Sequence, residues 1–189
     1  MTVVLHACCG PCASACVPRL TAAGHDVTLL FANSNLDTRA EYERRKAAAA
    51  ALAAHDGVAF AALDYDHGEW LREVAAGFED EPEKGRRCER CFRYNLGKAA
   101  AYAAARGCEA FTTSLTVSPH KPSALVFAAG RAAAESCAAT GAGAAPQFLE
   151  EDFKKKEGFK LSVRRAAELG LYRQSYCGCE FSRRKETTV

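Results

Sequence analysis

The stretch TVVLHACCGPCASAC, residues 2–16, joins an apolar run to four cysteines within nine positions. Residues 2–6 are typical of a buried β-strand, because apolar and β-branched side chains follow one another without a polar break. A cysteine loop follows directly, and a helix is expected over about residues 13–23, ending at Gly24. The order strand, loop, helix predicts the opening unit of an α/β fold, with Cys12 at or near the helix N-terminus.

Strands and helices are expected to alternate along the rest of the chain. Further strands are predicted at residues 26–32, 58–63, 109–115 and around Phe148. Helices are predicted at residues 38–55, 69–76, 88–107, 123–139 and 160–170. This alternation predicts an α/β fold with a parallel, Rossmann-like sheet and helices on both faces. With the strand order 3-2-1-4-5, the loops after the first and fourth strands meet where such sheets bind ligands.

The length of 189 residues fits one α/β domain. We expect a core over about residues 1–150 and a C-terminal appendage of helix and loop over about 151–189. No signal peptide or membrane span is recognisable, so a cytoplasmic protein without a membrane partner is expected. The net charge of +2 neither requires nor excludes a nucleic-acid partner.

Ten cysteines in a reducing compartment indicate metal binding or redox chemistry rather than a disulfide framework. Most of them form three clusters: Cys8, Cys9, Cys12 and Cys16; Cys88 and Cys91; Cys177 and Cys179. Four thiolates are what a [4Fe–4S] cluster requires, and a zinc site with four cysteines is the alternative that only stabilises the fold. The isolated Cys108 and Cys137 are expected to be inert.

Two of these motifs also fit redox chemistry without a metal. The sequence Cys9-Gly-Pro-Cys12 matches the dithiol motif of thioredoxin, although a dithiol alone leaves the other cysteine pairs unexplained. Cys177 and Cys179 are one residue apart, so they can close only a small, strained disulfide, or they can chelate one iron. Spacing alone therefore leaves an iron–sulfur cluster, zinc and dithiol chemistry open.

Four motifs in chain order resemble the QueH-type epoxyqueuosine reductases: LHACCGPC (5–12), CERCFRYNL (88–96), TTSLTVSPHK (112–121) and ELGLYRQSYCGCEFS (168–182). The resemblance spans essentially the whole chain, and the last motif is the most specific. It implies an α/β core of the nucleotide-hydrolase-like (HUP) class. It also implies a cytosolic bacterial iron–sulfur enzyme that reduces epoxyqueuosine to queuosine at the tRNA wobble position.

The resemblance further implies site residues and partners. Cys8, Cys9, Cys88 and Cys91 would hold the [4Fe–4S] cluster. Cys12, Cys177 and Cys179 would be the catalytic set, either holding a second iron or cycling as a Cys177–Cys179 disulfide. Electrons would come from an external donor of the ferredoxin or flavodoxin type. The chain departs from the family pattern outside the thiolates, at Ser34, Asp37, Thr38, His67, His120 and Lys121.

Converting an epoxide to an alkene removes one oxygen and consumes two electrons and two protons. Side chains are poor one-electron carriers, so a metal cofactor is needed. The proton donor is not identified by the sequence; the candidates are Asp64, Asp66 and Tyr176. Two alternatives remain: a four-cysteine zinc protein that binds RNA without redox activity, and a thiol–disulfide oxidoreductase that uses the CGPC motif.

A tRNA partner requires cations for its phosphates and aromatic side chains for its unpaired bases. Candidate cations flank the cysteine motifs: Arg86, Arg87, Arg90, Arg93, Lys154, Lys155, Lys156, Arg164, Arg165, Arg173, Arg183, Arg184 and Lys185. Tyr176 and Phe92 are the aromatic candidates for stacking on a flipped wobble base.

Overall fold

A five-stranded parallel sheet organises the computed structural model, which describes residues 1–139 and 145–183. The strand order is β3-β2-β1-β4-β5, the order assumed in the sequence analysis. The strands are β1 (Thr2–His6), β2 (Asp26–Phe31), β3 (Ala59–Ala62), β4 (Ala110–Thr113) and β5 (Gln147–Phe148). Neighbouring strands are in parallel register, with Thr2 beside Asp26 and Val3 beside Ala110. The carboxyl ends of β1 and β4, at the centre of the sheet, therefore lie side by side.

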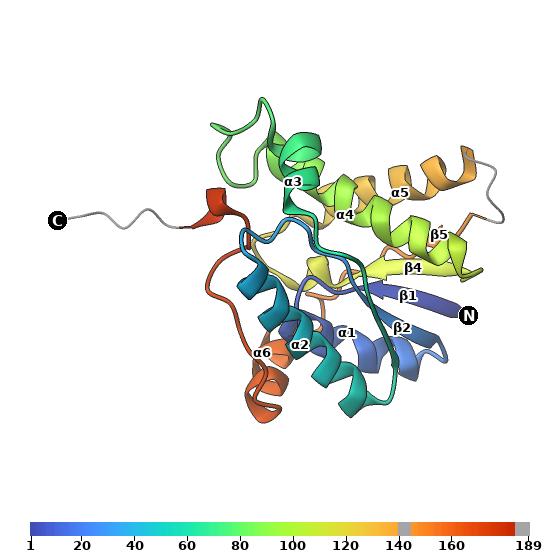
Figure 1. Cartoon of the computed structure of the whole chain (residues 1–189). Helices are drawn as coiled ribbons and strands as arrows, with labels where there is room; N and C mark the ends of the chain where they lie inside the picture. Colours follow the sequence, from blue (N-terminus) through green and yellow to red (C-terminus); the bar gives the residue numbers. More distant parts are fainter. Residues whose placement is uncertain (140–144, 184–189) are drawn as a thin grey trace.

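Helices cover both faces of this sheet (Figure 1). They are α1 (Gly10–Ala22), α2 (Arg39–Asp56), α3 (His67–Trp70), α4 (Arg86–Ala105), α5 (Ser123–Ala139) and α6 (Gly158–Glu168). One face carries α1, α2 and α6, and the other carries α4 and α5. The predicted α/β class with a parallel sheet is confirmed.

The central strand β1 joins two hydrophobic cores. Successive side chains on a strand point to opposite faces. Leu5 accordingly packs with α1 and α2, and Val4 packs with α4 and α5. Both side chains are fully buried, as expected for a strand covered on both faces.

Several elements differ from their predicted bounds by a few residues; α1, for example, begins at Gly10 rather than near residue 13. Two of the differences have a clear local cause. The expected helix at 69–76 is a short α3 followed by a π-helical turn, Leu71–Ala75. It begins earlier because the Asp66 carboxylate accepts a hydrogen bond from the Glu69 N–H at 2.7 Å and caps the helix. The expected strand at 109–115 ends at Thr113, whose hydroxyl accepts a hydrogen bond from the Leu115 N–H and starts a 3₁₀ turn, Ser114–Val117.

The C-terminal helical and loop segment packs against the core. Helix α6 lies on α1 through small residues at one face, Gly158, Ser162 and Ala166, and Phe153 before it is 1% exposed. The chain then returns to the carboxyl edge of the sheet and ends its described part in a 3₁₀ turn, Glu180–Ser182 (Figure 1). The division into a core of about 1–150 and an appendage of about 151–189 stays a prediction. No helix within the described residues is long and apolar enough to cross a membrane.

Candidate functional site

The cysteine loop is shaped by the start of α1. Cys9 is the N-cap of this helix, and its sulfur accepts a hydrogen bond from the Cys12 backbone N–H at 3.4 Å. Pro11 occupies the first turn, where its missing N–H costs nothing. A Cβ at Gly10 would lie 2.7 Å from the Ala48 carbonyl oxygen, so glycine is what lets α1 approach α2 so closely. The loop is therefore held in place by packing as well as by its cap.

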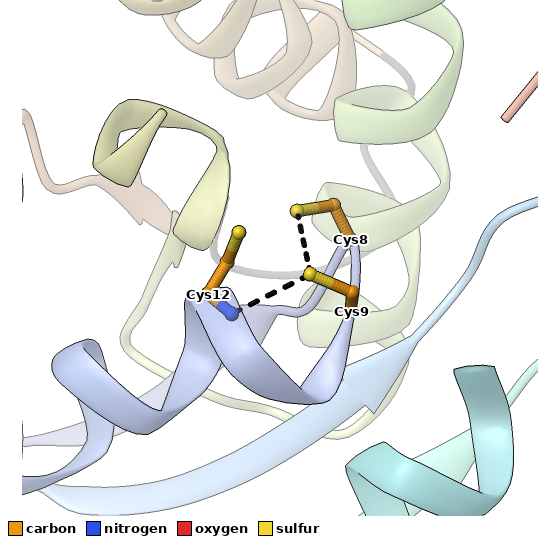
Figure 2. A group of neighbouring side chains, drawn as sticks. All are labelled: Cys8, Cys9 and Cys12. Atoms are coloured by element: carbon orange, nitrogen blue, oxygen red, sulfur yellow. Dashed lines mark hydrogen bonds between the residues drawn. The ribbon is translucent and has the colours of Figure 1, made fainter. Parts of the chain in front are cut away.

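Three thiols converge in this loop (Figure 2). The Sγ atoms of Cys8, Cys9 and Cys12 all lie within 4.8 Å of one another, and none of the three is in a disulfide. Over residues 1–139 and 145–183, they are the one group of three or more histidine, cysteine or acidic ligands packed this tightly. Three convergent sulfurs form a soft donor set that suits iron–sulfur clusters or zinc.

The three thiols are not equivalent. Hydrogen bonds from the Cys12 and Cys8 thiols hold the pKa of Cys9 well below its usual value, which outweighs the opposing effect of burial. Contact with Cys8 and Cys9, together with burial, raises the pKa of Cys12. Cys9 is thus the first of the three to form a thiolate, which is the form of cysteine that can bind a metal.

The loop forms one wall of a pocket of about 480 Å³ at the carboxyl edge of the sheet. Two distant cysteines line the same pocket, Cys91 from α4 and Cys177 from the C-terminal segment. Cys88 lies one turn before Cys91, and its sulfur accepts a hydrogen bond from the Lys84 N–H at 3.2 Å. The pocket is thus lined by cysteines from all three motifs, although Cys88 and Cys179 are not among its lining residues. The assignment of Cys8, Cys9, Cys88 and Cys91 as one ligand set stays a prediction.

Lys121 supplies positive charge to this pocket. Its ammonium nitrogen lies 3.7 Å from the Cys177 sulfur, and Lys121 lines the pocket with the cysteines. Burial acts to lower the pKa of Lys121, but the charges of Cys177, Cys8 and the other loop thiols raise it. The sequence marks Lys121 only as a departure from the family pattern; its neighbours in space are what give it a role.

The segment with Cys177 and Cys179 is fixed by backbone hydrogen bonds. Arg45 Nη1 donates to the Cys177 carbonyl oxygen at 2.8 Å, and the Asp37 N–H donates to the Gly178 carbonyl oxygen at 2.9 Å. Gly178 has φ 141°, and a Cβ there would lie 2.4 Å from Leu36 Cδ2. Cys179 is 9% exposed, and burial raises the pKa of its thiol. Only glycine fits between these two cysteines.

Several departures from the family pattern lie against this same segment. The Asp37 carboxylate accepts a hydrogen bond from the Tyr176 hydroxyl at 2.8 Å. His67 Nδ1 contacts the Ser34 carbonyl oxygen at 2.9 Å, and its Nε2 contacts the Glu180 carboxylate at 3.2 Å. Their spatial grouping, invisible in the sequence, indicates that they act together to hold the C-terminal segment.

The structure separates the proton-donor candidates. Asp64 and Asp66 line a second pocket of about 270 Å³, together with Glu69 and Lys98. Tyr176 lines the cysteine pocket, where burial and its hydrogen bond to Asp37 raise the pKa of the phenol to about 12. Tyr176 is therefore the one of the three candidates that lines the cysteine pocket, and its raised pKa keeps the phenol protonated at neutral pH.

The guanidinium groups of some cations predicted to meet phosphates bind other groups of the protein. Arg87 is 2% exposed, and its guanidinium donates to the carbonyl oxygens of Phe78, Glu79 and Glu81. Arg90 donates to carbonyl oxygens of the π-helical turn. Arg165 pairs with Asp56 at 2.6 Å.

The other predicted cations vary in their surroundings. Arg183 pairs with Asp37, and the exposed Arg86 pairs with Glu81 at 2.7 Å. Arg93 is exposed. Arg184 and Lys185 lie outside the described residues. Among the predicted cations of 154–173, Lys154 is half-buried and donates to the Lys121 carbonyl oxygen at 2.7 Å. Those that are exposed are Lys155, Lys156, Arg164 and Arg173, and Arg173 lines the pocket.

The two aromatic rings predicted to stack on a base are only partly accessible. The guanidinium carbons of Arg45 and Arg183 lie over the Tyr176 ring, at 5.2 and 4.9 Å from its centre. Phe92 is 7% exposed. Phe159, which the sequence analysis does not single out, is 38% exposed and also lines the pocket. Its position on α6 beside a run of lysines is the signal that could have found it.

Comparisons with known proteins give a consistent result. The family model described as epoxyqueuosine reductase QueH matches residues 3–185. The epoxyqueuosine reductase QueH of Streptococcus pyogenes serotype M1 is 35% identical over 187 residues, covering 96% of this chain and 70% of the relative. That of Thermotoga maritima is 33% identical over 190 residues, covering 96% of this chain and 90% of the relative.

One solved structure shares the fold. It is the U34-tRNA thiolase NcsA from Methanococcus maripaludis with its [4Fe-4S] cluster, with a TM-score of 0.56 and 9% identity. The match covers 97% of this chain and 62% of NcsA. At this identity the likeness shows the α/β fold alone.

Proposed function

Because the chain belongs to the epoxyqueuosine reductase QueH family, we propose that its cysteine pocket binds a [4Fe–4S] cluster and reduces epoxyqueuosine within tRNA. The chain is thus an oxidoreductase, and the proposal concerns where and how the reaction takes place. The convergence of the Cys8, Cys9 and Cys12 sulfurs within 4.8 Å carries this proposal. Its position in a pocket of about 480 Å³ gives room for a base beside the sulfurs.

The donor set fits such a cluster. The pocket is lined by thiols from three separate segments, and thiolates are the usual ligands of iron–sulfur clusters. Cys88 and Cys91 are one helical turn apart on α4, so both sulfurs lie on the same side of the helix. With Cys8 and Cys9 they make the proposed ligand set. Cys12, Cys177 and Cys179 then remain for a second iron or for a redox-active disulfide.

The reaction requires electrons and protons in equal number. Two C–O bonds of the epoxide break, a C=C double bond forms, and the oxygen leaves as water after uptake of two electrons and two protons. A bound [4Fe–4S] cluster supplies single electrons, which an external donor of ferredoxin or flavodoxin type replaces. The chain's own residues supply position, charge and protons.

Named residues suit these tasks. Tyr176 is the proton-donor candidate that lines the pocket, and its hydroxyl would have to turn away from Asp37, to which it donates at 2.8 Å, to reach the leaving oxygen. The Lys121 ammonium stabilises negative charge that develops beside the sulfurs. Asn95 lines the pocket, and its buried side-chain oxygen has no hydrogen-bond partner among the described residues. That oxygen is suited to accept a hydrogen bond from the substrate.

Anaerobic purification followed by iron, sulfide and zinc analysis tests the proposal. We expect a brown protein with about four irons and four sulfides per chain, with more iron if a second site is filled. Replacing Cys8, Cys9, Cys88 or Cys91 by alanine should abolish the visible absorption. A colourless zinc protein would instead support a structural four-cysteine site, and full activity of the metal-free protein would support the dithiol alternative.

A further inference from the structure

One face of α6 exposes apolar side chains beside the cysteine pocket. Phe159 is 38% exposed and Val163 is 36% exposed, and Met1 is the other large hydrophobic residue with comparable exposure in the described part of the chain. Phe159 and Val163 are four residues apart, so they lie together on one side of the helix. The adjacent side, with Gly158, Ser162 and Ala166, is buried against the core. The exposed side is thus an unpartnered face with a fixed orientation.

Cations stand on both sides of α6 in the chain. Lys155 and Lys156 are exposed just before α6, and Arg173 is exposed after it. Within residues 1–139 and 145–183, no ion pair involves these three side chains. Lys160 and Arg164, also on α6, pair with Glu157 and Glu168, but all four of these side chains are more than half exposed. Such exposed pairs are weak and exchange readily for other partners.

The pocket and this face are continuous. Phe159, Ser162 and Arg173 line the cysteine pocket, and the Arg173 guanidinium carbon lies 5.5 Å from the centre of the Phe159 ring. An aromatic ring with a cation beside it suits a nucleobase, which stacks on the ring while its phosphate meets the cation. When one base enters the pocket, the nucleotides before and after it in the RNA lie at the mouth of the pocket.

We propose that this α6 face, made of Lys155, Lys156, Phe159, Val163 and Arg173, binds the anticodon-loop nucleotides that flank the wobble base, and that one flanking base stacks on Phe159. The inference rests on the proposed function, because it takes the substrate base to be part of an RNA strand. Unpaired loop bases are available for such stacking, whereas bases within an RNA helix are not. An exposed ring with a cation beside it is an arrangement that a single strand recognises without sequence readout.

The test measures binding of a fluorescently labelled anticodon stem-loop RNA to the iron-loaded protein. F159A should weaken binding about tenfold, whereas F159W, which keeps a ring, should bind like the wild type. The double variant K155A/K156A should lower the slope of log affinity against log salt by about 1.5. The matched control is R131A, which removes an exposed arginine of α5 on the other side of the sheet, and its affinity should not change.

An RNA variant identifies the contact directly. We compare stem-loops in which the nucleotide before or after the wobble position lacks its base. With one of these RNAs, wild type and F159A should bind equally weakly, because the ring has lost its partner. If F159A weakens all RNAs by the same factor, or none, the stacking assignment is wrong.

The outcomes separate this inference from the proposed function. If the wild type does not bind the stem-loop at all, the proposed RNA substrate is wrong, and the inference falls with it. If the wild type binds the stem-loop and both F159A and K155A/K156A bind it as tightly as the wild type does, only the assignment of the α6 face as the RNA-binding site is wrong. If these variants keep RNA affinity but lose reduction by a ferredoxin-type protein donor, the face binds the donor, and the inference is overturned.

Discussion

Arg45 on α2 donates a hydrogen bond to the Cys177 carbonyl oxygen at 2.8 Å, across 132 positions of sequence. Its guanidinium also pairs with Glu41 at 2.6 Å, and the side chains of both residues are almost fully buried. The Tyr172 hydroxyl donates to the same Glu41 carboxylate at 2.9 Å. One buried ion pair thus holds the C-terminal cysteines over the loop of α1.

Breaking that pair should release the C-terminal segment. R45M leaves the Glu41 carboxylate buried without its main partner, so the free energy of unfolding should fall by about 3–5 kcal/mol. Arg44 is a matched control, because it pairs with Glu41 at 2.6 Å but its own side chain is 59% exposed. R44A should cost no more than about 1 kcal/mol. Urea titration of both variants checks this, and equal losses would contradict it.

A methyl group at Gly178 should disorder the same segment by a different route. G178A forces alanine to φ 141° and against Leu36, so we expect a loss of at least 1–3 kcal/mol, about what an unfavourable backbone conformation costs. At Gly97 on α4, an added methyl group would meet no atom within 4 Å, so G97A should be neutral or stabilising by up to about 1 kcal/mol. Thermal unfolding and turnover of the two variants give the comparison. A G178A protein as active and stable as G97A would show that the segment tolerates rearrangement.

Cys177 and Cys179 should be needed for turnover and not for cluster assembly. C177A and C179A should stay brown and bind tRNA, yet fail to reduce the epoxide. C108A, which removes a half-buried thiol outside the cysteine pocket, should keep its activity. Iron counts then distinguish the two roles: iron beyond four per chain that is lost in these variants indicates a second iron. Wild-type turnover in both variants would leave the motif with a structural role only.

Lys121 should make the bound cluster easier to reduce. A cation beside the Cys177 sulfur favours the more negative, reduced state, because the two charges attract in a partly dry pocket. K121M should therefore shift the cluster's midpoint potential to a more negative value, while K121R should stay near the wild type. A potentiometric titration followed by electron paramagnetic resonance measures this. An unchanged midpoint potential in an iron-replete K121M protein would show that Lys121 does not influence the redox properties of the cluster.

Local patterns predict much of this molecule. The uninterrupted apolar residues of β1, the loop after it and the Gly24 stop predict the first β/α unit, and the alternation that follows predicts the parallel sheet. The strand order is an assumption, which the structure matches. The functional loop is also local, since Cys9 and Cys12 act within one helical turn. Periodicity and capping are sufficient for such features because they depend on neighbours in sequence.

Long-range contacts account for what the sequence does not predict. Arg87 stands in a basic run, but the carbonyls of residues 78–81 fold back onto its guanidinium and withdraw it from solvent. Lys121 gains its role only because the C-terminal segment returns 56 positions later to place Cys177 beside it. The exposure of Phe159 likewise depends on which side of α6 meets α1. These depend on how separate elements dock, which side-chain type alone does not specify.

The central claim is that the cysteine pocket, loaded with iron and sulfide, reduces epoxyqueuosine in tRNA. A single-turnover reaction tests it most directly. Anaerobically reduced, iron-loaded protein is mixed with tRNA that carries epoxyqueuosine. The tRNA is then digested, and the mass of the modified nucleoside is measured by mass spectrometry. We predict that the nucleoside loses the mass of one oxygen atom with wild-type protein and keeps it with the metal-free protein or with C9A. Equal conversion by the metal-free protein, or none by the iron-replete wild type, would contradict the account.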